Sequence, residues 1–79
     1  MKLLLFARAR DLIGADSIDV ANPEPAKIGD LRQRLVREFP HLAGLVEKSA
    51  FAVNDEFADD TTPIPSGAEV ALLPPVSGG

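Results

Sequence analysis

The chain has 79 residues, of which 46% are hydrophobic and 25% charged, and it contains no cysteine. These proportions are those of an ordinary globular domain, and a single domain of this size buries only about 60% of its unfolded surface. So small a core leaves little room for an enclosed catalytic pocket, which favours a carrier or binding module over a self-contained enzyme. The lack of cysteine excludes disulfides and cysteine-ligated metals, and it is compatible with a reducing compartment.

The net charge of −4 is unevenly distributed. Residues 1–48 hold all eight Lys and Arg against seven acids, whereas residues 49–79 hold five acids and no basic residue. An acidic C-terminal third argues against a nucleic-acid partner, because phosphates are bound by Lys and Arg. It suits either a basic partner surface or plain solvated loop charge.

The N-terminal segment MKLLLFARAR has a superficial likeness to a signal peptide. Its apolar stretch, residues 3–7, is too short for one and runs directly into Arg8 and Arg10. Nothing approaches the roughly 20 apolar residues of a membrane-spanning helix. We therefore expect no membrane partner and a cytoplasmic location.

Residues 3–10 begin as a strand, with Leu3 and Leu5 on one side and Leu4 and Phe6 on the other. A turn around Gly14 then leads to a second strand over residues 17–20. Two strands so close in sequence predict an antiparallel hairpin with a longer loop.

After a proline-rich connector, apolar residues recur at the spacing of one helix face, beginning at Ile28 and ending at Phe39. Pro40 ends this helix, because the residue before a proline is disfavoured in the α region. Residues 41–49 allow a further short turn of helix.

Three more strand segments follow. Residues 51–53 form a brief strand, Asn54-Asp55 a turn, and Phe57 begins the return strand; Ser66-Gly67 is the next tight bend. The last strand begins at Glu69, and its apolar character places it beside the first strand at the centre of the sheet. The order predicts a two-layer α+β domain, a mixed sheet packed on one main helix.

Side chains offer no catalytic constellation. His41 is the only histidine, so tetrahedral zinc is improbable, and no serine lies in a motif that would pair it with His41. The acids Asp55, Glu56, Asp59 and Asp60 lack the spacing of a calcium loop. We expect no metal site and no bound cofactor.

The C-terminal segment remains. We divide the chain into a domain, residues 1–73, and a flexible tail, residues 74–79. Pro74-Pro75 imposes an extended, stiff segment, and Gly78-Gly79 could thread a channel too narrow for any side chain. The alternative is a frayed terminus. A frayed terminus, however, would have no use for two stiff prolines placed just before a pair of glycines.

The reactive group of such a tail would be the terminal carboxylate of Gly79. With a reference pKa of about 3.3–3.7 it is ionised at neutral pH and is a poor electrophile. It must first be activated, for example as an acyl-adenylate made with ATP by a second enzyme. Sulfide would then give a thiocarboxylate, whereas an amine or a partner's cysteine would give ubiquitin-type conjugation.

Three segments carry a family resemblance: KLLLFARARDLIG, FAVND and GAEVALLPPVSGG. Together they resemble the small subunit of molybdopterin synthase, the MoaD family, in the expected order and over essentially the whole chain. The resemblance implies a ubiquitin-like β-grasp fold with an extended Gly-Gly tail. It also implies a non-catalytic sulfur carrier whose large partner subunit completes the sulfurtransferase reaction.

In that family the terminal glycine is adenylated by a partner that resembles ubiquitin-activating enzymes and becomes a thiocarboxylate. The tail then enters the large synthase subunit, where sulfur passes to a pterin precursor to form the dithiolene. By position, Gly79 would carry the acyl-adenylate and the sulfur (as 1-thioglycine). Partner contacts would be made by Phe6, Arg10, Phe57, Leu73, Pro75, Val76, Ser77 and Gly78. The resemblance also implies a hetero-tetramer with the large subunit.

This sequence departs from the family at Leu72 and Leu73, where aromatic residues are frequent, and at Lys27, where the helix often starts with a Thr-like residue. Neither departure touches the tail. A ubiquitin-like modifier, or a carrier for thiamin synthesis or tRNA thiolation, is the main alternative. A plain interaction domain with a passive tail is a third.

Overall fold

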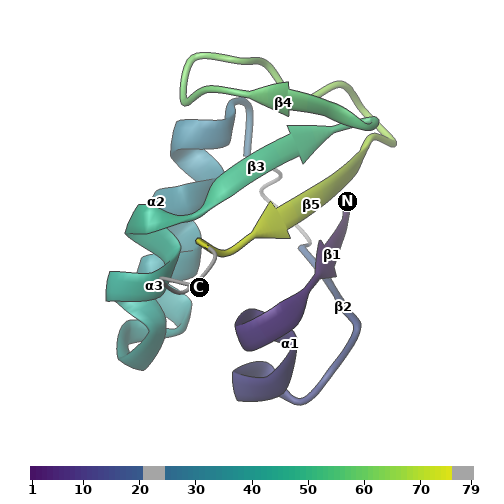
Figure 1. Ribbon diagram of the computed structural model, residues 1–79. Helices are drawn as coiled ribbons and strands as arrows, with labels where there is room; N and C mark the ends of the chain where they lie inside the picture. Colours follow the sequence, from purple (N-terminus) through teal and green to yellow (C-terminus); the bar gives the residue numbers. More distant parts are fainter. Residues whose placement is uncertain (21–24, 76–79) are drawn as a thin grey trace.

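The structure is a computed structural model that describes residues 1–20 and 25–75 (Figure 1). Its elements, in chain order, are β1 (Lys2–Leu5), α1 (Ala7–Ile13), β2 (Ser17–Asp19), α2 (Ile28–Glu38), the 3-10 turn η1 (Pro40–Leu42), α3 (Ala43–Lys48), β3 (Ala50–Val53), β4 (Glu56–Ala58) and β5 (Glu69–Leu73). Among the described residues, no helix has both the length and the apolar character needed to cross a membrane.

The five strands form one mixed sheet in the order β2-β1-β5-β3-β4. The first and last strands, β1 and β5, are parallel and central, with Leu3 opposite Val70 and Leu5 opposite Leu72. The other neighbours, β1–β2, β3–β5 and β3–β4, are antiparallel. The predicted mixed sheet and the central pairing of the first and last strands are confirmed.

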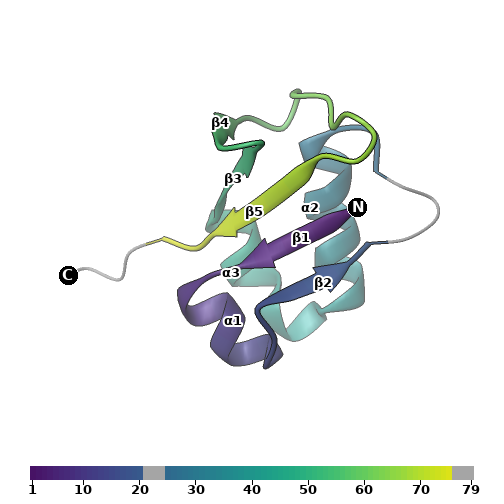
Figure 2. The same ribbon diagram turned by 90° about the vertical axis from the view of Figure 1, so that its right-hand side faces the viewer.

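Helix α2 is the main helix predicted from the apolar spacing. Ile28, Leu31 and Leu35 are buried along one face, and the main-chain N–H of Lys27 donates to a carboxylate oxygen of Asp30 at the helix start. The helix ends at Glu38, two residues before Pro40. In Figure 2, α2 and α3 lie behind the sheet, so they cover one of its faces.

The core lies between that sheet face and the helices. Leu3, Leu5, Val70 and Leu72 are each at most 2% exposed and belong to the same buried cluster as the apolar face of α2. Phe51 of β3 is fully buried among them. Leu3 and Leu5 thus share the buried side of β1, which agrees with the strand alternation predicted for them.

The prediction of a strand through Arg10 is wrong, because β1 ends at Leu5 and the chain enters α1. The Phe6 carbonyl accepts hydrogen bonds from the N–H groups of Ala9 and Arg10. Ala9 is fully buried and Ile13 packs against the core, so the buried spacing is that of a helix face. The alternation of Ala and Arg imitated the period of a strand.

The predicted turns are confirmed. Gly14 ends α1 with a left-handed backbone, φ +82°. Asn54 and Asp55 join β3 to β4 with φ of +48° and +70°, the pattern of a two-residue hairpin turn. Gly67 has φ +76° just before β5.

Candidate functional site

The face of the sheet opposite α2, called the outer face below, carries a continuous apolar row. Leu4 lies opposite Ala71, Ala71 opposite Ala52, and Ala52 opposite Phe57. These side chains are on the opposite side of their strands from the buried core residues, because strand side chains alternate. The row crosses four strands and ends at Phe57, which is 82% exposed.

A second group lies at the end of the sheet where β5 finishes (Figure 2). Leu5 pairs with Leu72, so Phe6 follows the end of β1 beside Leu73. Phe6 is 44% exposed and Leu73 is half-buried. The sequence analysis placed Phe6 on one side of the first strand together with Leu4; in the structure β1 ends at Leu5 and Phe6 sits at the β1–α1 junction.

Helix α1, which the sequence analysis did not predict, contributes further exposed side chains at this end of the molecule. Leu12 on α1 is a further large apolar side chain that is 44% exposed. Arg10 reaches Asp11 and Asp16 only at 3.9 and 4.0 Å, and such long, exposed ion pairs are weak. The guanidinium of Arg10 is therefore open to a partner.

Large apolar side chains at a surface usually mark an interaction site when they gather. Leu73 and the apolar row lie on the sheet face opposite α2, and Phe6 is exposed at the adjoining end of β1. Beyond Leu73, the chain continues through half-buried Pro74 to exposed Pro75. Val76, Ser77, Gly78 and Gly79 lie outside the described residues.

The side chains offer little alternative chemistry. Within residues 1–20 and 25–75 no group of three or more His, Asp or Glu side chains is arranged to hold a metal ion. His41 makes only an edge contact with the Phe39 ring, at 6.4 Å between centroids. Asp59 accepts hydrogen bonds from Thr61 and Thr62, and Asp60 pairs with Arg32.

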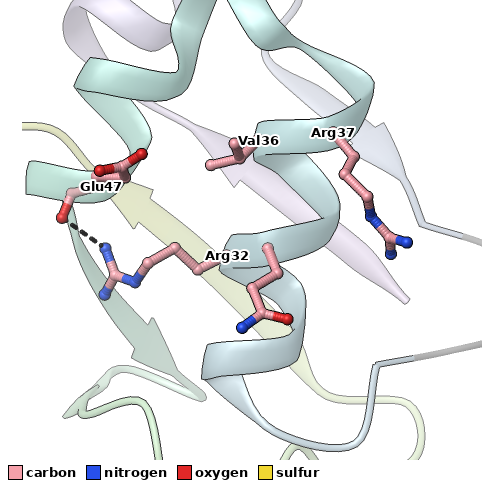
Figure 3. Close-up of a pocket in the computed structure, with 5 residues that line it drawn as sticks. Arg32, Val36, Arg37 and Glu47 are labelled. Atoms are coloured by element: carbon pink, nitrogen blue, oxygen red, sulfur yellow. Dashed lines mark hydrogen bonds between the residues drawn. The ribbon is translucent and has the colours of Figure 1, made fainter.

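A cavity of about 470 Å³ lies along α2 and α3 and includes Val36, Arg37 and Glu47 in its wall (Figure 3). The guanidinium of Arg32, which also lines this cavity, already has partners within the protein. It donates hydrogen bonds to the carbonyl oxygens of Val46, Glu47 and Ser49. It also stacks 4.9 Å from the centre of the Phe51 ring. Arg32 therefore joins α2 to the end of α3 and the start of β3, a role that helix periodicity alone does not predict.

Comparison with known proteins decides the family. Residues 3–79 match the model of the ThiS family. The chain belongs to the ThiS family. A curated relative, the molybdopterin synthase sulfur carrier subunit of Dictyostelium discoideum, is 38% identical over 81 residues. The match covers 99% of this chain and 94% of that protein.

Solved structures share the fold. One chain of a complex of subunits 1 and 2 of the molybdopterin-converting factor from Helicobacter pylori is similar with a TM-score of 0.68 and 28% identity, covering 99% and 96% of the two chains. Small archaeal modifier protein 1 of H. volcanii is similar with a TM-score of 0.77 and 28% identity, covering 95% of each chain. The predicted ubiquitin-like β-grasp fold and the resemblance to the molybdopterin synthase small subunit are confirmed.

Proposed function

We propose that this ThiS-family protein is the sulfur-carrier subunit of a molybdopterin synthase, with sulfur carried on the carboxyl carbon of Gly79. The observation that carries the proposal is the position of the exposed Phe6 and the half-buried Leu73 beside the point where β5 leads into the tail. The full-length similarity to molybdopterin synthase sulfur carrier subunits supports it.

The proposed chemistry has two steps. An adenylyltransferase that resembles ubiquitin-activating enzymes joins the Gly79 carboxylate to the α-phosphate of ATP and releases pyrophosphate. Sulfide from a sulfur donor then attacks the acyl carbon, AMP leaves, and a thiocarboxylate remains. In this scheme no side chain of this protein acts as an acid or a base.

The large subunit of the synthase is the proposed acceptor. Phe6, Phe57 and Leu73 would dock on it through the outer face, and Arg10 would pair with one of its acidic groups. Pro75, Val76, Ser77 and Gly78 would lead Gly79 into its active site, where sulfur passes to the pterin precursor. The H. pylori complex of subunits 1 and 2 supports a partner of this kind. A hetero-tetramer and a cytoplasmic location complete the proposal.

Conjugation to other proteins is the second candidate, since a protein titled as a small archaeal modifier shares the fold at 28% identity. The two functions diverge after adenylation, because the acyl carbon is attacked by sulfide in one and by a lysine amine in the other. Service to thiamin synthesis or tRNA thiolation would share the thiocarboxylate and differ in the acceptor.

Intact-mass spectrometry tests the proposal. After incubation with ATP, a sulfide donor and the cognate adenylyltransferase, we expect the mass gain of one oxygen-to-sulfur exchange, located at Gly79. Adding the large subunit and the pterin precursor should remove it. Charging without discharge would contradict the molybdopterin assignment, and a covalent adduct on lysines would favour the modifier. A chain lacking Gly79 is the control: it should fold normally and stay uncharged.

A further inference from the structure

The free edge of β4 carries features that the tail chemistry does not use. β4 is the last strand of the sheet, so only one of its sides is paired. We propose that β4 is a docking edge that accepts an extended, positively charged segment of a partner protein as an additional strand. The proposal concerns the body of the domain and is independent of what Gly79 carries.

The hairpin geometry identifies which main-chain groups are free. Val53 and Glu56 flank the two-residue turn and lie opposite each other, so they form a hydrogen-bonded pair. Phe51 and Ala58 form the next such pair. Phe57 lies between these pairs and therefore directs its N–H and C=O away from β3. Nothing else in residues 1–20 and 25–75 bonds to these two groups.

The segment that follows β4 lines a groove together with the β3–β4 hairpin but is not paired with this edge. Pro63 and Pro65 have no N–H to donate. The N–H of Thr62 is bonded to the Asp59 carbonyl, and that of Ile64 to the Ala26 carbonyl. The main-chain donors of residues 62–65 are therefore absent or already used, which leaves the edge open to a strand from another molecule.

The space between the two segments is a groove. Its volume is about 350 Å³, and its walls come from the β3–β4 hairpin and from Thr62, Pro63 and Pro65. Volumes of about 300–1,000 Å³ are typical of binding pockets. Side chains that alternate along an added strand could enter this groove on one side and contact exposed Phe57 on the other.

Charge defines the chemistry of the incoming strand. Asp55 lies in the turn, Glu56 begins β4, and both are exposed without an ion-pair partner in the described structure. No Lys or Arg occurs from residue 49 to residue 79. A basic strand would neutralise these carboxylates. A second copy of this chain fits poorly, because antiparallel pairing at Phe57 would bring two acidic hairpins together.

Titration with three capped peptides tests the proposal, by nuclear magnetic resonance of the labelled full chain. The first alternates lysine and valine, the second alternates glutamate and valine, and the third is the first with methylated main-chain nitrogens. We expect the lysine peptide alone to shift the Phe57 amide and slow its hydrogen exchange. The Ser17 amide, on the opposite edge strand β2, should not respond.

Charge variants complete the test. Asp55→Lys with Glu56→Lys should weaken binding of the lysine peptide by about tenfold or more. Asp19→Lys with Glu47→Lys changes the net charge equally at exposed sites away from β4 and should leave the affinity within about twofold. Equal binding of the glutamate or the methylated peptide would overturn the proposal. So would a response at Ser17 in place of Phe57, or concentration-dependent pairing of the chain with itself through β4.

Discussion

The two faces of the sheet use the same strands and serve different purposes. On the inner face, Leu72 is 1% exposed and packs in the core, whereas its neighbour Leu73 lies half-buried on the outer face beside Phe6. The inner face is completed by α2, and the outer face is left uncovered. Residues that stabilise the domain and residues that would bind partners are therefore adjacent in sequence, separated only by strand alternation.

A pair of alanine substitutions tests the difference between the two faces. Leu72→Ala should lower the free energy of unfolding by about 2–5 kcal/mol, because it removes buried methyl groups and leaves a cavity. Leu73→Ala should cost less than about 1 kcal/mol but weaken binding to the large subunit. Urea unfolding and titration calorimetry measure the two effects. Equal destabilisation by both would show that the outer face belongs to the core.

A second comparison concerns two arginines on α2. The side chain of Arg32 is 19% exposed and bonds three carbonyl oxygens. Its charge also pairs with Asp60 at 2.9 Å and lies over the Phe51 ring. Arg37 lines the same cavity as Arg32, and within the described residues it makes none of these contacts.

Arg32→Ala should therefore lower the free energy of unfolding by about 2–4 kcal/mol. The substitution leaves the three carbonyl oxygens without their donor and removes the cation–π interaction with the Phe51 ring. Arg37→Ala, the matched control, should stay within about 0.5 kcal/mol. Chemical unfolding of both variants checks this. A small effect of Arg32→Ala would mean that water replaces the guanidinium at little cost.

Much of the fold could be predicted because the local signals agreed with the global arrangement. Three sequence patterns each predict a single local structure: the apolar spacing of α2, the end of that helix before Pro40, and the turn at Asn54-Asp55. The pairing of the first and last strands followed from their apolar character. The buried side of β1 and β5 then followed from alternation.

Helix α1 could not be predicted in the same way. Its seven residues are too few to display a clear helical period, and the alternating Ala and Arg match a strand equally well. The decisive contact is the burial of Ala9, which depends on tertiary packing. Arg32 shows the same limit, since its carbonyl partners come from a segment 14 to 17 residues later. The role proposed for Gly79 rests on the tail motif and the family resemblance, since that residue bears no side chain.

The smallest expected effect is a pH response in the loop that connects β4 to β5. Hydrogen bonds from the Thr61 side chain and main chain, and from Thr62, hold the pKa of the Asp59 carboxyl below its ordinary value of 3.8. The turn they support leads directly to Asp60, which pairs with Arg32 and whose carbonyl accepts the Gly29 N–H. Asp59 thus helps to hold the loop against α2.

Because the pKa of Asp59 is lower in the folded state than in the unfolded state, its contribution to stability is present above the ordinary value. It is lost as the pH falls through the folded-state pKa. We expect the stability difference between the parent protein and Asp59→Asn to shrink on acidification below 3.8. Urea unfolding over that range, with carboxyl carbon shifts to locate the Asp59 titration, measures it. A stability difference that stays constant with pH would show that the charge of the Asp59 carboxylate does not contribute to stability.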